Sequence, residues 1–80
     1  MDKELKLMMT EFLIRHYPIG RYKHLGTKRF KRGVLIDNGD IIFFDNKEKL
    51  FFMHQYLTNI LKKVFNCKDQ LCKSVIQEFI

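Results

Sequence analysis

The segment Arg29–Asp45 constrains the fold more than any other part of the chain. Two runs rich in β-branched and aromatic residues, Phe30–Ile36 and Ile41–Phe44, flank the polar sequence Asp37–Asp40. An Asn-Gly pair at the centre of such a segment is a strong hairpin signal, because a type I′ turn needs positive φ at both central residues. The sequence therefore predicts a β-hairpin closed by a two-residue turn.

This turn fixes a register for the two strands. Ile36 is expected opposite Ile41, and Val34 opposite Phe43, on one face of the hairpin. The other face is expected to hold Leu35, Ile42 and Phe44. Both faces are apolar, and an isolated two-stranded hairpin is not stable. Other elements should therefore cover it.

Helical periodicity supplies those elements. Apolar residues recur at helical spacing from about Lys3 to Tyr17, where Pro and Gly follow, and again from about Asn46 to Phe65 and from about Asp69 to the end. Asp45 is expected to cap the second of these helices. Ile19–Lys28 is Gly-punctuated and polar, which predicts a loop. The expected fold is a single small α+β domain, residues 1–80, of order α-β-β-α-α, with the β-hairpin packed against three helices.

The length and hydropathy of the chain limit the number of domains it can form and the compartment in which it is expected. Eighty residues make one domain with a thin core. No apolar run approaches the roughly 18 residues that a membrane span needs, and the charged N-terminus lacks the apolar stretch of a secretory signal. We expect a cytoplasmic protein in a reducing compartment with no membrane partner.

The two cysteines fit the same expectation. If Cys67 and Cys72 lie on one helix, their Cα atoms are about 8–9 Å apart, which is too far for an unstrained disulfide. A pair with this spacing and no further ligands is also poor for zinc. Cys72 is therefore predicted to be a small core residue and Cys67 to have no special role.

Positive charge is concentrated in one segment. The chain carries a net charge of +6, and no carboxylate occurs from Phe12 to Ile36, a stretch that holds seven Lys and Arg. Basic residues interleaved with aromatic ones are typical of a surface that binds phosphates and stacks on bases. The residues predicted to bind are Arg15, Arg21, Tyr22, Lys23, His24, Lys28, Arg29, Lys31 and Arg32.

These features favour a small basic non-enzymatic protein that engages the phosphate backbone of nucleic acid, DNA or RNA, through Arg15–Arg32. The alternative is a small inhibitor or adaptor, of the type that viruses and phages encode, which docks this surface on an acidic groove of another protein. A third interpretation is a solvated segment whose charges only maintain solubility. No zinc-finger, RNP or GxxG signature selects among them.

No constellation predicts catalysis. Asp37, Asp45 and Lys47 bear a superficial similarity to the metal-binding motif of the PD-(D/E)xK nucleases, but one hairpin is too little sheet for that fold. We interpret them, with Asp40, as turn and cap residues. The three histidines occur in different elements without helical pairing. We therefore expect no enzyme activity, no metal, no cofactor and no small-molecule substrate.

The apolar residues exceed what one small core requires. Leu7 and Ile14 lie seven residues apart on the back of the first helix, and Phe51 and Phe52 flank the apolar face of the second. A second copy of the chain is the simplest cover for such surfaces, so a homodimer through Leu7 and Ile14 is predicted. The alternative is that three helices wrap both sides of the hairpin within one chain.

Overall fold

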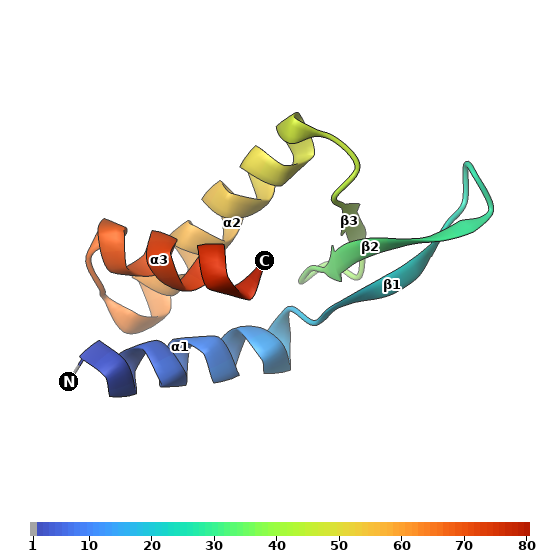
Figure 1. Cartoon of the computed structure of the whole chain (residues 1–80). Coiled ribbons are helices and arrows are strands. Elements are labelled where there is room, and N and C mark those ends of the chain that lie inside the picture. The colour runs from blue at the N-terminus through green and yellow to red at the C-terminus, as the bar shows by residue number, and fades with distance from the viewer. Residues whose placement is uncertain (1) are drawn as a thin grey trace.

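Three helices pack together at one end of a three-stranded antiparallel sheet in the computed structural model, which describes residues 2–80 (Figure 1). The elements in chain order are α1 (Asp2–His16), β1 (Ile19–His24), β2 (Arg29–Leu35), β3 (Ile41–Phe43), α2 (Lys47–Phe65) and α3 (Asp69–Phe79). The strands lie in the order β1-β2-β3. The predicted α+β class and the three helices are confirmed.

The core lies among the helices and the base of the sheet. Its buried apolar side chains come from α1 and the residue that follows it, β2, α2 and α3, and they are Met9, Leu13, Tyr17, Val34, Met53, Leu57, Leu61, Cys72, Val75 and Ile76. Burying an aliphatic side chain of this size contributes about 1.5–3 kcal/mol. Cys72 is a core residue, as predicted.

The ends of α2 are set by two asparagines. The side chain of Asn46 accepts a hydrogen bond from the Lys49 N–H at 2.8 Å, and Asn66 adopts a left-handed conformation with φ of 53°. The prediction that Asp45 caps this helix is wrong by one residue. Its carboxylate instead lies 3.6 Å from the Lys49 ammonium.

The sheet has a third strand that the sequence did not predict. The expected loop Ile19–Lys28 is wrong, since its first part forms β1 and pairs with β2 from Ile19 opposite Val34 to His24 opposite Arg29. Most of β1 lies away from the core, so it lacks the alternation of apolar residues by which half-buried strands are recognised. The element order is therefore α-β-β-β-α-α.

The turn between β2 and β3 is longer than the expected type I′ turn. Ile36 donates its N–H to the Asp40 carbonyl and accepts from Gly39 N–H, both at 2.9 Å, which encloses three residues. Only Gly39, with φ of 88°, has positive φ here. The backbone of Asn38 does not adopt the left-handed conformation that a type I′ turn needs. Its side-chain oxygen instead accepts a hydrogen bond from the Asp40 N–H.

This longer turn shifts the register by one residue. Val34 pairs with Ile42 and Leu35 with Ile41, so the predicted pairing of Val34 with Phe43 is wrong. A shift of one residue moves every side chain of a strand to the opposite face. Ile42 therefore packs against the core, and Ile41 lies on the outer face.

The outer face of the sheet is not covered by the helices. Its apolar residues Leu35, Ile41 and Phe43 are half-buried and do not join the core, whereas Ile36 and Ile42 do. All three helices lie together at the same end of the sheet (Figure 1). The alternative that the three helices wrap both sides of the hairpin is therefore wrong for residues 2–80, and cover of the outer face by a second copy of the chain stays a prediction.

A carboxylate ties the β2–β3 turn to two helices. Asp37 Oδ2 accepts hydrogen bonds from the Tyr17 hydroxyl at 2.7 Å, just after α1, and from the Tyr56 hydroxyl of α2 at 2.9 Å. Burial and the adjacent Asp37 carboxylate raise the pKa of Tyr17 and, to a smaller degree, that of Tyr56. Both phenols therefore stay protonated and donate at neutral pH.

The outer part of the β1–β2 ribbon projects beyond the rest of the molecule. β3 pairs only with Gly33–Leu35, so residues 21–32 form a two-stranded ribbon, which we call the arm. The chain measures 44 × 22 × 21 Å with a radius of gyration of 13.1 Å, above the value of about 12 Å typical of a compact chain of this length. The arm accounts for the elongation seen in Figure 1.

Candidate nucleic-acid interface

The arm presents side chains on two faces. Residues directly opposite each other in an antiparallel pair share a face, and faces alternate along a strand. One face of the arm carries Arg21, Lys23, Phe30 and Arg32. The other face carries Tyr22, His24, Arg29 and Lys31. Each face therefore has at least two cations.

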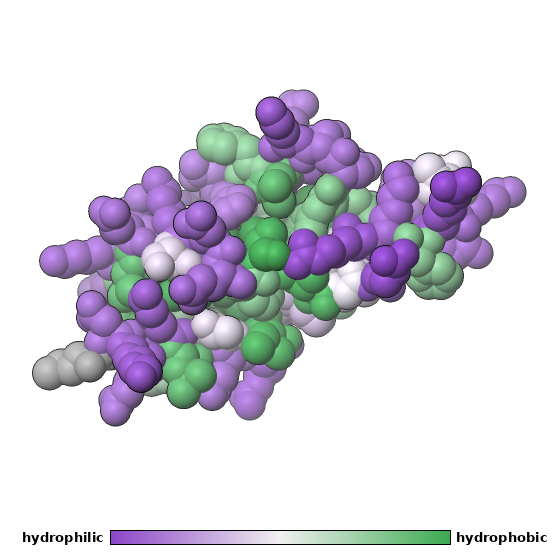
Figure 2. All heavy atoms as spheres, in the orientation of Figure 1, coloured by the Kyte–Doolittle hydropathy of each residue, from purple (hydrophilic) through white to green (hydrophobic). Residues whose placement is uncertain are grey.

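These cations are not neutralised within the chain. Arg21, Lys23, Lys28 and Arg29 are exposed, and Lys31 is half-buried. Within residues 2–80, the ion pairs lie at the start of α2 and around Asp69, and none involves the arm. In Figure 2 the projecting end is covered mainly by hydrophilic residues. The arm is thus a concentrated source of positive potential.

Two of the arginines also stabilise the base of the arm. Arg32 donates to the backbone oxygen of Ile80, and its guanidinium lies 5.1 Å from the centre of the Phe44 ring. Arg21 stands directly opposite Arg32 and donates to the Phe30 carbonyl at 3.3 Å. Arg32 therefore has structural contacts within the chain, whereas the cations nearer the tip of the arm are left to bind a partner.

The aromatic residues of β1 make structural contacts within the chain. Tyr22 is half-buried, its hydroxyl donates to the Pro18 carbonyl at 2.9 Å, and its ring lies beside Gly20. His24 packs edge-on against Phe43, with ring centres 4.8 Å apart. The aromatic ring that the arm leaves exposed is Phe30, at 60%.

The tip of the arm is an ordered four-residue turn. Lys28 adopts φ of 59° and donates its N–H to the His24 carbonyl at 2.7 Å, while the His24 Nδ1 accepts from Thr27 N–H at 3.2 Å. These bonds display Leu25, which is 84% exposed. Sequence reasoning missed Leu25 as a surface residue of the site and counted Phe30 only among the aromatic residues interleaved with the basic ones. The available signal was a lone leucine beside a glycine in a polar, basic segment.

The chain has no match among the protein-family models, the curated proteins or the solved structures with which it was compared. Of the residues predicted to bind, those of β1, the tip and β2 are brought together in the arm. Arg15 is exposed in the last turn of α1, before β1 begins, and is not part of the arm.

The back of α1 is exposed as the sequence indicated. Leu7 and Ile14 are 60% and 59% exposed, and Met8 beside them is 57% exposed. Phe51 and Phe52 of α2 are also more than half exposed. Single exposed apolar residues are common on protein surfaces. The predicted homodimer therefore stays a prediction.

The acidic residues around the hairpin do not converge. Asp37 accepts from two tyrosines, Asp40 pairs with Asn38 across the turn, and Asp45 pairs with Lys49. Asp40 and Asp45 thus have local partners, as expected of turn and helix-start residues, whereas Asp37 has two partners that are distant in the chain. Within residues 2–80, no three His, Cys, Asp or Glu side chains are placed to hold a metal, and no helix is long and apolar enough to cross a membrane.

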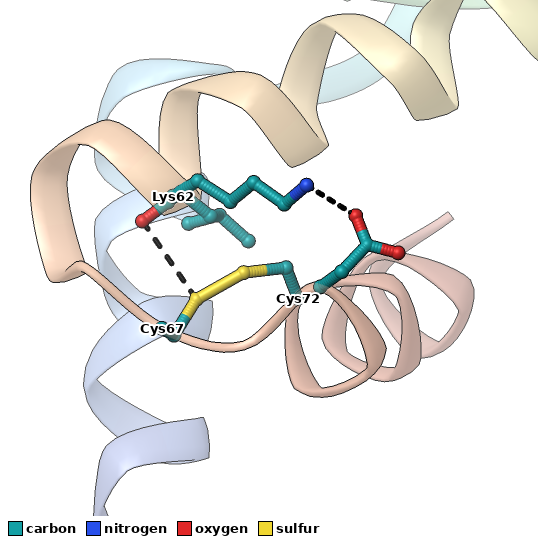
Figure 3. Close-up of a disulfide and its surroundings, with 5 residues drawn as sticks. Lys62, Cys67 and Cys72 are labelled. Atoms are coloured by element: carbon teal, nitrogen blue, oxygen red, sulfur yellow. Dashed lines mark hydrogen bonds and ion pairs between the residues drawn. A yellow bond between two sulfur atoms is a disulfide. The ribbon is translucent and has the colours of Figure 1, made fainter.

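The two cysteines are joined at the α2–α3 junction (Figure 3). Cys67 precedes α3 and does not lie on it, which brings its Cα to 6.6 Å from that of Cys72. The prediction of two separated thiols is therefore wrong, because it assumed one continuous helix. Cys67 Sγ lies 3.8 Å from the Leu61 carbonyl oxygen, a contact that becomes a hydrogen bond only when the sulfur carries a proton.

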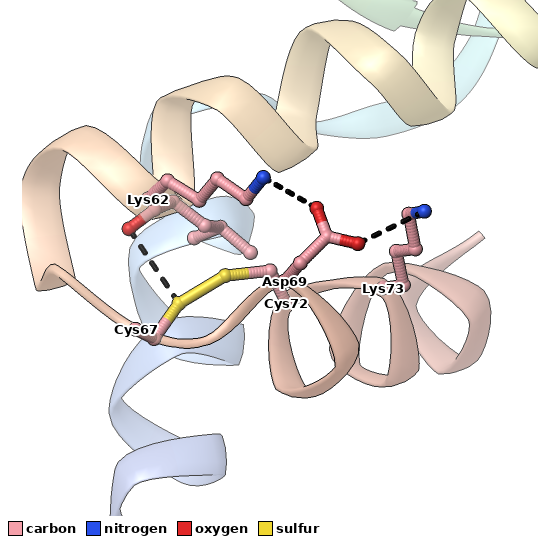
Figure 4. A network of polar contacts seen from close by, with 6 residues as sticks. Lys62, Cys67, Asp69, Cys72 and Lys73 are labelled. Atoms are coloured by element: carbon pink, nitrogen blue, oxygen red, sulfur yellow. Dashed lines mark hydrogen bonds and ion pairs between the residues drawn. A yellow bond between two sulfur atoms is a disulfide. The ribbon is translucent and has the colours of Figure 1, made fainter.

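A small ionic network lies beside this link (Figure 4). The Asp69 carboxylate in the first turn of α3 bridges Lys62 at the end of α2 and Lys73 one turn further along α3. These two lysines lower the pKa of Asp69. The network is exposed, and such surface pairs contribute little to stability. Its cations are thereby less available for binding than those of the arm.

Proposed function

We propose that the chain is a small non-enzymatic protein that binds nucleic acid by placing the cations of the arm against backbone phosphates. The observation that carries this proposal is the arm itself, an exposed ribbon with cations on both faces and without carboxylate partners. Phosphate contacts of this kind release counterions and supply affinity without sequence preference. The cytoplasmic setting predicted from the sequence is part of this proposal, and in such a reducing compartment the link between Cys67 and Cys72 would open to two thiols.

The test is the salt dependence of binding to mixed-sequence nucleic acid, measured by fluorescence anisotropy. The logarithm of the affinity should fall with the logarithm of salt concentration at a slope of about −0.9 per neutralised phosphate. Four arm cations engaged together on duplex DNA predict a slope of about −3.6. No measurable binding to DNA or RNA at low salt would overturn the proposal.

Two matched variants separate the arm from net charge. The arm variant replaces Lys23, Lys28, Arg29 and Lys31 with Ala and leaves Arg32, which contacts Phe44, in place. The control variant replaces four exposed lysines outside the arm, namely Lys3, Lys47, Lys63 and Lys68. Both lose the same charge. We expect the arm variant alone to lose most of its affinity and its salt slope.

The non-enzymatic part of the proposal has its own test. Purified protein incubated with DNA or RNA and Mg²⁺ or Mn²⁺ should leave the nucleic acid intact, because the hairpin carboxylates have other partners. Metal-dependent cleavage that Asp45→Ala abolishes, in a variant that still folds, would show a nuclease instead.

An acidic protein surface is the second candidate partner. Gly20 and Tyr22 alternate with Arg21 and Lys23 along β1, which is an edge strand of the sheet. An edge strand can accept an added strand, and cations beside it favour an acidic one. Binding of an acidic peptide, without binding of nucleic acid at low salt, would support this role over the first.

A further inference from the structure

Resting on the proposed function, we propose that the arm enters the major groove of double-stranded DNA and that Leu25 and Phe30 contact the methyl groups of thymine there. The proposal joins two features of the arm that phosphate binding alone does not use. These are the placement of cations on both faces and the exposure of two large apolar side chains among them.

Cations on both faces suit a groove. Lys23 lies on one face of the arm and Arg29 and Lys31 on the other, so the ribbon can meet phosphates on two sides at once. The two walls of a duplex groove present phosphates in that way, whereas a single strand offers one backbone. A single strand is instead usually bound by stacking on several aromatic rings. The arm exposes one such ring, since Tyr22 is half-buried against its own strand.

The width of the arm matches one of the grooves that double-stranded DNA and RNA present. Two paired strands lie about 4.8 Å apart, and with side chains such a ribbon fits the B-form major groove, which is about 12 Å wide. The minor groove, about 6 Å wide, is too narrow for it. The major groove of double-stranded RNA is deep and narrow, and side chains cannot read it. Duplex DNA is therefore the matching class of partner.

The arm is long enough to reach the floor of that groove. From Arg21 to Leu25 the strand spans about 13 Å at 3.3 Å per residue, compared with a groove depth of about 8.5 Å. Cations along the strands can therefore stay beside the phosphates while the tip reaches the base edges. The His24 and Lys28 hydrogen bonds hold the backbone of the turn that carries Leu25, so this residue is kept at the tip of the arm.

The apolar group that Leu25 and Phe30 would meet is the C5-methyl of thymine, the one apolar group that a base pair displays in the major groove. Leu25 is 84% exposed and Phe30 is 60% exposed, so neither side chain is needed by the core. Phe30 stands directly opposite Lys23, and Leu25 lies in the polar turn between His24 and Arg29, so both apolar side chains are exposed to water in a basic segment. Burial against methyl groups removes that apolar surface from water.

The test compares two duplexes of one A·T-rich sequence, one with thymine and one with uracil at every thymine position. The substitution removes only the major-groove methyl groups and leaves the phosphates unchanged. Wild-type protein should bind the thymine duplex more tightly, by about fourfold for each methyl group buried. A Leu25→Ser, Phe30→Ser variant should bind both duplexes equally, with the salt slope of the wild type. A Leu25→Met variant should keep the preference.

The outcomes separate this inference from the proposed function. Equal wild-type affinity for both duplexes, with steep salt dependence, retains phosphate binding and overturns major-groove contact. Tighter binding to single strands or to RNA of the same sequence also overturns it, as does displacement by the minor-groove ligand netropsin. Binding to anionic vesicles that Leu25→Ser abolishes, without DNA binding, overturns both proposals. Circular dichroism confirms that each variant is folded.

Discussion

Tyr17→Phe removes one hydroxyl from the interior and leaves the aromatic ring in place. The side chain is 3% exposed, and its hydroxyl lies 2.7 Å from the Asp37 carboxylate. A hydrogen bond to a charged group contributes about 1.5–3 kcal/mol. We expect the free energy of unfolding to fall by about 2 kcal/mol, which in a chain of this length lowers the Tm by about 10 °C.

Urea denaturation followed by circular dichroism measures this loss, and Tyr22→Phe is the matched control. The Tyr22 hydroxyl donates to a neutral acceptor, the Pro18 carbonyl, at 2.9 Å. Neutral hydrogen bonds contribute about 0.5–1.5 kcal/mol. Tyr17→Phe should therefore cost more than Tyr22→Phe. A loss equal to that of the control, or smaller, would refute the idea that the carboxylate strengthens the bond.

The same contact predicts an alkaline loss of stability. Burial and Asp37 raise the pKa of Tyr17 and Tyr56 above the ordinary value of 10.0, so the folded state holds these protons more tightly than the unfolded state. Stability is therefore fully present below about pH 10 and is lost as the pH rises from there through the folded-state pKa values. Urea midpoints from pH 8 to 11.5 should fall less steeply for Tyr17→Phe than for the wild type. Parallel curves would refute the linkage.

Three further substitutions test other parts of the fold. Thr58→Val should raise the free energy of unfolding by about 1 kcal/mol in a urea titration, because the hydroxyl of this residue, 2% exposed, has no hydrogen-bond partner within residues 2–80. Gly33→Ala should lower it by about 1–3 kcal/mol, since an added Cβ would lie 2.9 Å from the Ile42 carbonyl oxygen. Cys67→Ser should lower it by about 2 kcal/mol under oxidising conditions, the entropy of a short closed loop, and unchanged stability there would show that the link contributes nothing.

The helices could be predicted from sequence because each buries an apolar stripe. Residues such as Met53, Leu57 and Leu61 recur at helical spacing and are fully buried. β1 could not be predicted in the same way. Its pairing with β2 places Arg21 opposite Arg32 and Lys23 opposite Phe30, outside the core, so burial leaves no alternating pattern in the sequence.

The hairpin register shows where local rules yield to tertiary contacts. An Asn-Gly pair favours a two-residue turn, yet the chain forms a longer one. The longer turn places Asp37 where Tyr17 and Tyr56 both reach it, and these partners are 20 and 19 residues away in the chain. The cysteine link was missed for a different reason. The distance between the two Cα atoms was calculated for one continuous helix, although the predicted start of the third helix at about Asp69, which the structure has, already placed Cys67 before it.

The candidate site was predicted in its charge but not in its shape. The stretch without carboxylates contains all the cations that the structure gathers on the arm. Sequence alone did not show that this stretch is a projecting ribbon, because the pairing of β1 with β2 carries little apolar signal. Leu25 consequently gained significance only once its exposure was known, and Phe30 was considered before only as one of the aromatic residues near the cations.

Because the arm is separate from the core, its surface residues can be substituted during evolution without loss of the fold. The tip and outer strands contribute no side chain to the buried core, whose members lie in the helices, at Tyr17 and at Val34. Amide protons of the arm should therefore exchange through local opening, without global unfolding. Substitutions there carry little cost in stability, so new surface chemistry can be sampled on the arm while the scaffold that carries it stays folded.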